Sequence, residues 1–367
     1  MTILLIAGTR PEVIKLAPVV LELRSRGIGH TFCLTGQQRQ MSRQMLDVFG
    51  LDAQVDLDVM SERQSLSTLS QRLLAALSPL VRKVLPRAVV VQGDTTSALV
   101  GALSAFYEQV PVAHVEAGLR TTDFYDPFPE EVNRRLISVL SRVHLAPTAA
   151  ARDNLLREGV DASTIHVTGN TVVDALQHVV ARSRLPAGTS LERAVGSGRV
   201  VLVTMHRREN LGEPMRRVFR AVAALARSLP DVQVVFPVHL NPAVRSLVAE
   251  ELAGAERVHL VDPLGYEQLA WVLARCSFVM TDSGGLQEEA PALGKPVLVL
   301  RENTERPEGI SAGTARLVGT ATEVVLAAAF ELLNDADAYR RMATAVSPYG
   351  DGNAAPRVVD QLERFLA

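Results

Sequence analysis

The stretch AHVEAGLRTTDFYDPFPEEVNRR, residues 113–135, contains enough acid for proton-transfer chemistry; its carboxylates are Glu116, Asp123, Asp126, Glu130 and Glu131. Glu116 directly follows an apolar run, where a buried charge is costly unless it has a partner, so its position predicts a catalytic role. Asp123 and Asp126 lie in a turn-rich segment and are expected to be solvated or to cap a turn. Glu130 and Glu131 open a helical pattern, and each would gain about 0.3–1 kcal/mol from the helix dipole, so the pattern does not choose between them.

Three more groups that could transfer protons follow apolar runs: Asp94, His206 and His239. Asp94 is either an acid/base group or a helix cap, although the two threonines after it could also cap. His206 is either catalytic or a satisfied core histidine. Charged residues at 207–209 follow it at once, which indicates polar surroundings.

The segment TDSGGLQEEAPALGKP (281–296) has the features of a phosphate-binding turn. Ser283, Gly284 and Gly285 separate an apolar run from a helical pattern, so glycines would let the backbone approach a ligand and a helix start would offer free N–H groups. A plain serine-capped turn is the alternative. Glu289 lies one turn further and either accepts hydrogen bonds from a ribose or faces solvent.

Cations stand at a second strand-to-helix turn, AGTRPEVIK (7–15), which contains Arg10 and Lys15. A positive charge at a helix start opposes the helix dipole, so an anionic ligand explains these residues better than stability does. Arg306 lies in a loop, where it is either solvated or, beside a phosphate, a bidentate clamp.

Other site classes find no support in the sequence. No GxGxxG follows the first strand pattern, since AGTRPE stands there, and Gly350-x-Gly352 follows no strand. No histidine pair has metal-ligand spacing, and Cys33 and Cys276 lie singly in apolar runs. We expect no cofactor and no metal.

The elements that must position these residues alternate along the chain. Short apolar runs alternate with longer helical segments, which is typical of a buried parallel sheet covered by helices on both faces. The runs lie at 3–9, 30–35, 88–93, 110–116, 144–148 and 165–170, and, after a polar stretch at 182–199, at 200–204, 232–238, 257–262, 276–282 and 295–300. The pattern predicts an α/β protein with two doubly wound domains joined near 171–198, with ligands at the carboxyl ends of the strands.

Composition narrows the class of protein further. Apolar residues make up 47% of the 367 residues, and the net charge of −2 gives no basic surface for nucleic acid. No apolar stretch approaches the roughly 20 residues of a membrane span, and the start of the chain lacks the pattern of a signal peptide. The expectation is a soluble cytoplasmic protein with no membrane partner.

The chain resembles the bacterial UDP-N-acetylglucosamine 2-epimerase family over essentially its whole length, through the ordered motifs GTRPEVIKLAP, QGDTT, HVEAGLR, PEEVNRR, VTMHRREN, PVHLNP, TDSGGLQEEAP and TERPE. The resemblance implies a glycosyltransferase-B type fold with the active site in the interdomain cleft. It places Rossmann-like domains at 1–172 and 173–353, with a helix at about 354–367 packing back on the first. It also implies a homodimer.

The implied reaction interconverts UDP-GlcNAc and UDP-ManNAc. The proton at C2 of the sugar has no adjacent carbonyl to acidify it, so the family eliminates UDP to form 2-acetamidoglucal and then adds UDP back after reprotonating the other face. This needs acid/base groups on both faces and donors on the departing diphosphate. By matching motifs, the catalytic set is Asp94, Glu116, Glu130 and His206, and the UDP set is Arg10, Lys15, Ser283, Gly284, Gly285, Glu289 and Arg306.

The family divides into two branches, and the motifs match the non-hydrolysing one, which binds a second UDP-GlcNAc as an activator. The matching residues are Gln37, Gln40, Arg63, Arg207 and His239; Gln38 stands where a histidine is usual. Leu264 and Leu269 replace a polar and an aromatic residue that usually help hold uracil. The alternatives are a hydrolysing epimerase that releases ManNAc and UDP, a glycosyltransferase of the same fold, and an idle nucleotide-sugar binder, against which the intact carboxylates argue.

Overall fold

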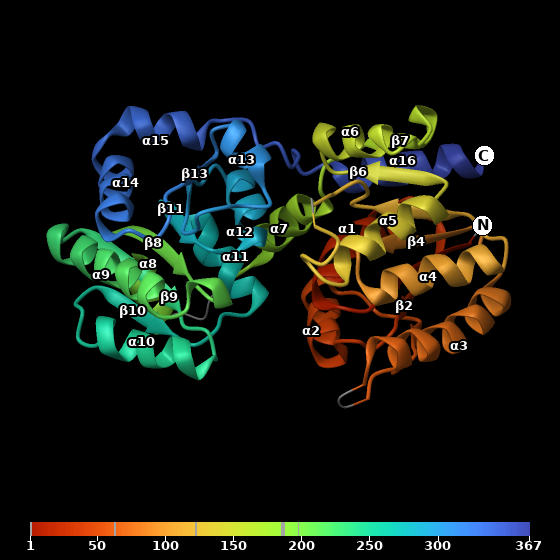
Figure 1. Cartoon of the computed structure of the whole chain (residues 1–367), viewed down its shortest axis with the longest axis horizontal. Coiled ribbons are helices and arrows are strands. Elements are labelled where there is room, and N and C mark those ends of the chain that lie inside the picture. Colours follow the sequence, from red (N-terminus) through yellow and green to blue (C-terminus); the bar gives the residue numbers. More distant parts are fainter. Residues whose placement is uncertain (1, 62–63, 122, 185–187, 197) are drawn as a thin grey trace. The chain divides into compact units, whose positions relative to one another are not determined.

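The computed structural model describes residues 2–61, 64–121, 123–184, 188–196 and 198–367. The chain divides into two compact units (Figure 1). The first comprises Met1–Gln177 and Tyr349–Ala367, and the second comprises His178–Pro348.

The first unit is built on a seven-stranded parallel sheet with the order β3-β2-β1-β4-β5-β6-β7. The chain order reverses between β1 and β4, which is the switch point where such sheets bind ligands. Its central strands are apolar and β-branched and are buried on both faces, as parallel strands between two helix layers must be. The strands are β1 (Thr2–Ala7), β2 (Gly29–Leu34), β3 (Val55–Asp56), β4 (Ala88–Gln92), β5 (Val112–Val115), β6 (Val143–Ala146) and β7 (Ile165–Val167).

Helices of the first unit pack in two layers, with α3, α4 and α5 in contact in one and α2, α1 and α16 in the other. Asp174 of α7 accepts hydrogen bonds from the backbone N–H groups of Ala354 and Ala355, at 3.2 and 2.8 Å, and so caps the start of α16. The helices are α1 (Arg10–Ser25), α2 (Arg39–Phe49), α3 (Leu66–Val84), α4 (Thr96–Tyr107), α5 (Glu130–Leu140), α6 (Ala149–Arg157), α7 (Thr171–Arg182), which continues into the second unit, and α16 (Ala354–Leu366).

The second unit repeats the design with a six-stranded parallel sheet of order β10-β9-β8-β11-β12-β13. Its strands are β8 (Arg199–Thr204), β9 (Val232–Pro237), β10 (Val258–Val261), β11 (Phe278–Thr281), β12 (Val297–Val299) and β13 (Ala315–Leu317). Its helices are α8 (Ser190–Gly196), α9 (Glu213–Ser228), α10 (Pro242–Leu252), α11 (Tyr266–Arg275), α12 (Gly284–Glu289), α13 (Pro307–Ser311), α14 (Thr322–Asn334) and α15 (Ala336–Ala343).

The predicted α/β class with two doubly wound, Rossmann-like sheets is confirmed. The sequence did not predict the short strands β3 and β13, nor helix α8 inside the polar stretch at 182–199. Helix α8 forms there because it buries Leu191 and Ala194 under an otherwise polar surface. None of the helices in the described residues is long and apolar enough to cross a membrane.

Candidate active site

Glu116 lies at the centre of a buried polar cluster at the carboxyl edge of the first sheet. Lys15 of α1 forms an ion pair with its Oε1, and Gln92, the last residue of β4, donates to its Oε2. Asn170 Nδ2 also donates to Oε1, at 3.1 Å. These contacts give the buried charge its partners, and its position at the strand end leaves the carboxylate beside the switch point of the sheet.

The backbone of Glu116 adopts the left-handed conformation, with φ of 67°. Residues other than glycine rarely adopt a positive φ, because it strains the backbone. Such strained residues are concentrated at functional sites, where the surrounding structure enforces the conformation. Gly93, which follows the neighbouring strand β4, is also at positive φ, and a Cβ added to it would lie 3.6 Å from Glu116 Oε2. This geometry supports the catalytic interpretation of Glu116.

Asp94, one residue after Gly93, forms an ion pair with Arg134 of α5 at 2.6 Å. Its backbone carbonyl accepts a hydrogen bond from Asn133 Nδ2 at 2.8 Å. Burial raises the pKa of Asp94 above its ordinary value, although Arg134 opposes the rise; Glu116 adds to it through charge repulsion. A carboxyl whose pKa is raised by its surroundings suits general acid/base chemistry. The helix-cap alternative is not needed, because Thr95 accepts the N–H of Ala98 and caps α4 instead.

The structure shows different surroundings for Glu130 and Glu131, which the sequence pattern could not distinguish. Glu131 is fully buried, pairs with Arg134 at 3.2 Å and Arg135 at 2.7 Å, and accepts the backbone N–H of Thr121 at 3.0 Å. Glu131 therefore holds the segment in place. Glu130, the first residue of α5, lies close enough to Asp94 to contribute to the rise of its pKa.

Arg10 and Lys15, the two cations of the first strand-to-helix turn, have different surroundings. Lys15 contacts Glu116. Arg10 begins α1, and its backbone N–H donates to Gln38 Oε1 at 3.0 Å. Gln37 accepts a hydrogen bond from Ser97 at 2.9 Å, and Gln40 is exposed in the first turn of α2. Arg63, which belongs to the same expected set, lies outside the described residues.

In the second unit, His206 lies next to a buried carboxylate. Its Nδ1 lies 3.2 Å from Asp282 Oδ1, and its ring stacks on that of His239, with centroids 5.9 Å apart. Asp282 follows β11 directly and has no solvent exposure. Burial opposes its ionisation, but its hydrogen bonds, that from His206 foremost, hold the pKa of Asp282 below its ordinary value.

The predicted phosphate turn leaves β11 and opens helix α12. Ser283 precedes the helix, and its N–H donates to Thr281 Oγ1 at 2.9 Å. A Cβ on Gly284 would lie 3.1 Å from Glu305 Oε1, so the absence of a side chain at 284 lets the Glu305 carboxylate approach the turn. Glu305 pairs with Arg207 and Arg301; although burial opposes its ionisation, Arg301 lowers the pKa of Glu305 to about 2.

Glu289 and Arg306, the other predicted UDP ligands, are placed at the end of α12 and just before α13. Glu289 is buried, and the Arg306 guanidinium forms an ion pair with Glu288. Leu264 and Leu269 lie before and within α11 and are both partly buried.

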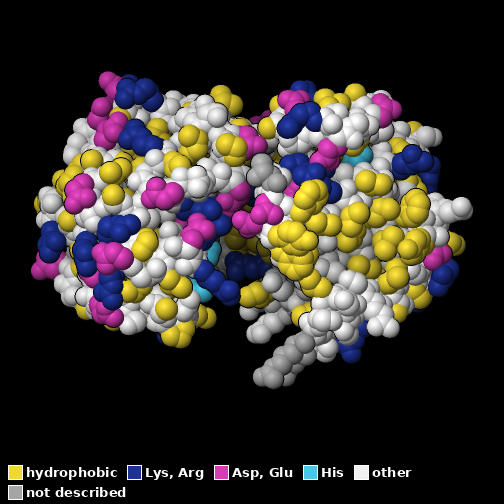
Figure 2. Space-filling view, in the orientation of Figure 1, with side chains coloured by type: hydrophobic (Ala, Val, Ile, Leu, Met, Phe, Trp, Pro, Cys, Tyr) yellow, Lys and Arg dark blue, Asp and Glu magenta, His cyan; other side chains and the backbone are white. Residues whose placement is uncertain are grey.

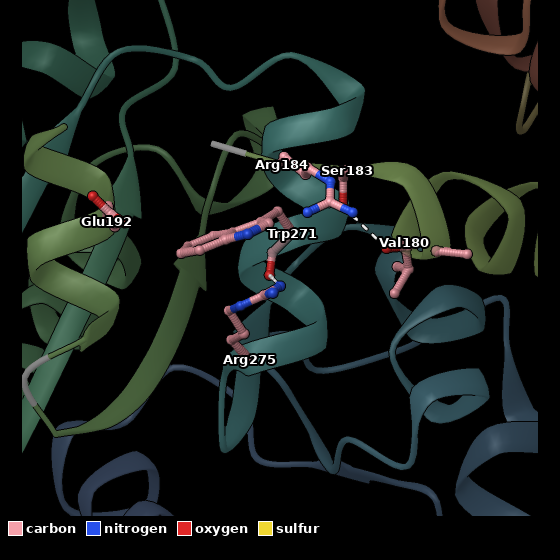
Figure 3. Close-up of a pocket in the computed structure, with 7 residues that line it drawn as sticks. Val180, Ser183, Arg184, Glu192, Trp271 and Arg275 are labelled. Atoms are coloured by element: carbon pink, nitrogen blue, oxygen red, sulfur yellow. Dashed lines mark hydrogen bonds between the residues drawn. The ribbon is translucent and has the colours of Figure 1, made fainter. Parts of the chain in front are cut away.

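A separate pocket of about 500 Å³ lies in the second unit, around α11 (Figure 3). The Arg275 guanidinium stands over the Trp271 ring at 4.2 Å from its centroid. The pocket contains none of the predicted site residues; its lining is Val180, Ala181, Ser183, Arg184, Glu192, Trp271 and Arg275. Nowhere in the described ranges do three or more His, Cys, Asp or Glu residues gather closely enough to hold a metal ion.

Sequence reasoning missed the residues that hold the predicted site residues in place: Gln92 and Asn170 at Glu116, Arg134 at Asp94, Asp282 at His206 and Glu288 at Arg306. Four of them lie inside quoted motifs and Asn170 ends the apolar run at 165–170, so the available signal was a polar residue at a strand end or close in sequence to a predicted site residue. Their partners come from other strands, and a linear pattern does not name them.

These clusters at strand ends, on two Rossmann-like sheets, define a protein of the glycosyltransferase-B type. The family model described as UDP-N-acetylglucosamine 2-epimerase matches residues 21–363. The UDP-N-acetylglucosamine 2-epimerase of Bacillus subtilis (strain 168) is 47% identical over 361 residues, which cover 98% of this chain and 94% of that protein. The chain belongs to the UDP-N-acetylglucosamine 2-epimerase family.

Solved structures agree. The UDP-GlcNAc 2-epimerase from Neisseria meningitidis, bound to UDP-GlcNAc, is 42% identical with a TM-score of 0.87, covering 99% of this chain and 100% of that one. The enzyme from Methanocaldococcus jannaschii, in complex with UDP-GlcNAc and UDP, is 31% identical with a TM-score of 0.79, and coverage is again 99% and 100%.

Proposed function

We propose that this protein is a UDP-N-acetylglucosamine 2-epimerase that interconverts UDP-GlcNAc and UDP-ManNAc. The observation that carries the proposal is the cluster around Glu116, a carboxylate held in a left-handed backbone conformation beside Asp94. Family membership supplies the substrate class, since a relative's structure holds UDP-GlcNAc.

The proposed reaction begins with removal of the C2 proton by a carboxylate while the C1–O bond breaks and its electron pair leaves with UDP. The product of this step is 2-acetamidoglucal. A second acid then protonates C2 on the opposite face, and UDP adds back at C1. Asp94 and Glu116 serve as the proton-transferring groups, with Glu130 supporting them, because two acids are needed on different faces. Lys15 and Arg134 keep these carboxylates oriented.

The residues proposed to bind UDP are Arg10, Ser283, Gly284, Gly285, Glu289 and Arg306, with His206 beside the diphosphate. Donors placed where charge develops on the leaving group lower the barrier to elimination. Glu289 accepts hydrogen bonds from the ribose. With leucines at 264 and 269, uracil is held through backbone contacts.

Two sequence features favour the non-hydrolysing branch: the glutamines at 37 and 40, and the pair Arg207 and His239. The test is to incubate the protein with UDP-GlcNAc alone in deuterated water and follow the products by proton NMR. Formation of UDP-ManNAc supports the proposal. Accumulation of free ManNAc and UDP assigns the protein to the hydrolysing class, and no reaction without an acceptor favours a transferase. The kitacinnamycin glycotransferase structure, at 15% identity, shares the fold alone.

We propose that a second UDP-GlcNAc acts as an activator. The Methanocaldococcus jannaschii structure holds two nucleotides, UDP-GlcNAc and UDP. In this chain Gln38 contacts the backbone of Arg10, so a ligand that touches the 37–40 segment would also act on a proposed UDP ligand. In the same assay, an initial rate that rises more steeply than the UDP-GlcNAc concentration supports activation, and a simple hyperbola contradicts it.

The protein is further proposed to be a homodimer. Hydrophobic side chains gather over α4 and α5 (Figure 2), and the exposed ones include Phe106, Tyr107, Val132, Leu136 and Val139. Large exposed apolar patches mark interaction sites. The stripe of residues 132, 136 and 139 carries no charge, so a second copy related by a twofold axis, which places the patch against itself, meets no like-charge repulsion there.

A further inference from the structure

His206 and Asp282 are brought together by two neighbouring strands of the second sheet. Strands β8 and β11 run in parallel with Thr204 opposite Thr281, so the residues that follow them emerge at the same edge. The side chain of Asp282 is fully buried, whereas that of His206 is 43% exposed. The pair therefore has an inner carboxylate and an outer imidazole.

The Asp282 carboxylate accepts hydrogen bonds from three donors in the 206–210 segment, and the His206 ring lies against it. The donors are the backbone N–H groups of His206 at 3.1 Å and Arg207 at 3.0 Å, and Asn210 Nδ2 at 3.1 Å; the His206 ring nitrogen Nδ1 lies 3.2 Å from Oδ1. A buried carboxylate with this many donors stays ionised, and its pKa is accordingly lowered. Its charge is thus available to the imidazole.

The contact fixes which ring nitrogen is free to act. A carboxylate only accepts hydrogen bonds, so it selects the form of His206 that has its proton on Nδ1. The other nitrogen, Nε2, then points away from the carboxylate. The same arrangement orients the histidine of hydrolytic triads, where the aspartate sets the tautomer and stabilises the charged imidazolium.

Other charged groups near His206 are already engaged. His239 stacks on the ring rather than bonding to it. Arg207 pairs with Glu305, and Arg301 pairs with Glu305 and Glu209. Within the described part of the chain, Asp282 is the carboxylate that contacts the imidazole.

We propose that Asp282 is the positioning residue for His206, holding its Nδ1–H so that Nε2 faces the diphosphate and donates to the oxygen on which charge develops as UDP departs. The inference rests on the proposed function. The carboxylate balances the positive charge on the ring when both nitrogens are protonated, and its contact with Nδ1, together with the stacked His239 ring, keeps the ring from turning over. The electron pair of the broken C1–O bond stays on UDP, and no covalent bond to His206 forms.

A purely structural role is the competing explanation, since Asp282 also ties down the 206–210 segment. Asp282→Asn separates the two. The amide oxygen still accepts the backbone N–H groups, but the amide is neutral and can present its own N–H to His206 Nδ1. Asn210→Ala is the matched control, because it removes another contact of Asp282 and loosens the same segment without touching the imidazole.

The first readout is kinetic. We expect Asp282→Asn to lower kcat about 10²-fold with little change in KM or in the Kd for UDP, and Asn210→Ala to lower it by less than about threefold. His206→Asn and the double variant H206N/D282N are expected to be equally slow, because both act through one ring. Additive losses, or an equal loss in Asn210→Ala, would overturn the proposal.

The second readout does not depend on activity. Nitrogen-15 NMR of the histidine side chains, with His206 assigned by its loss in His206→Asn, reports which ring nitrogen carries the proton. The wild type is expected to show His206 protonated at Nδ1 near neutral pH, and D282N a shift toward the Nε2 form. An unchanged tautomer in D282N overturns the pairing even if epimerisation occurs. If the tautomer changes as expected but the protein does not epimerise UDP-GlcNAc, the proposed function is wrong and the pairing of Asp282 with His206 still holds.

Discussion

Neighbouring residues of one type can have unlike roles in this protein, and the acids at 113–135 show how. Glu116 has a strained backbone conformation and three polar partners. Glu131 is buried and pairs with Arg134 and Arg135, whereas Asp123 is exposed. Burial and partners distinguish these residues, and both depend on the tertiary structure.

The first residue-scale prediction concerns Asp94. Asp94→Asn keeps an acceptor for Arg134, but the amide cannot take or give a proton, so C2 exchange should fall at least about 10³-fold while UDP binding changes little. The measurement pairs the NMR assay with calorimetric titration of UDP. Asp123→Asn, an exposed acid of the same stretch, is the control and should retain activity. Retained exchange in D94N would remove Asp94 from the catalytic set.

Part of this site could be predicted from residues alone. Glu116 was selected by its place at the end of an apolar run, whereas only the family resemblance selected Glu130 over Glu131. The sequence could not predict the roles of Gln92, Arg134, Asn170 and Asp282, because these roles depend on atoms supplied by other strands and helices. The assignments of individual site residues stay predictions until the variants are measured.

At the scale of elements, Glu12 connects two turns of the first sheet. Its carboxylate accepts the N–H groups of Gly8 at 3.0 Å and Thr9 at 2.7 Å, and also the hydroxyl of Thr95 at 2.7 Å. The first two belong to the turn before α1, which carries Arg10, and Thr95 caps α4 beside Asp94. The buried carboxylate therefore holds a proposed UDP ligand and a proposed acid in register.

This arrangement predicts a pH-dependent stability. Burial raises the pKa of Glu12 from 4.5 to about 6, with its hydrogen bonds limiting the rise. The folded state then binds this proton more tightly than the unfolded state, so the contribution of Glu12 is fully favourable below the unfolded value and is lost as the pH rises through the folded one. The difference amounts to about 2 kcal/mol.

The matched variant is Glu12→Gln, which keeps the shape and an acceptor but does not titrate. Hydrogen exchange of β1 and β4 in increasing urea, at pH values of about 4 to 7, reports the unfolding free energy of the first unit. The stability of the wild type relative to Glu12→Gln should fall by about 2 kcal/mol across this range. An identical pH slope in both proteins would show that Glu12 does not titrate there.

The longer elements were predictable because apolar runs of buried parallel strands and amphipathic helices are strong local signals. Strand β3 was not, since its two residues join the sheet only through pairing with β2. Helix α8 was not predictable either, because it lies within a polar stretch of the sequence. Short elements such as these exist because a neighbour offers hydrogen bonds or a surface to cover, and sequence periodicity does not report that neighbour.

At the scale of the whole molecule, the alternation of strands and helices, restarted after a polar stretch, was sufficient to predict two doubly wound sheets. The proposed association of two copies would use the apolar surface over α4 and α5, and surface exposure cannot be read from a helical pattern alone. Val139 is 84% exposed there, and Val346 in the second unit is 85% exposed, which gives a matched pair of sites.

Val139→Glu should therefore convert a dimer to a monomer, because a twofold axis would place two carboxylates in an apolar interface. Val346→Glu should leave the dimer intact. Sedimentation velocity at micromolar concentration measures the oligomeric state of the wild type and of both variants. A wild-type monomer, or equal behaviour of the two variants, would contradict the proposed interface.

The central claim is that a proton leaves and returns at C2 of the sugar while UDP departs and re-adds. The most direct measurement is proton NMR of UDP-GlcNAc incubated with the protein in deuterated water, with no acceptor present. The account predicts that deuterium enters at C2 as UDP-ManNAc forms, and that recovered UDP-GlcNAc becomes labelled at the same carbon. Formation of UDP-ManNAc without deuterium at C2, or unchanged UDP-GlcNAc after prolonged incubation, would contradict it.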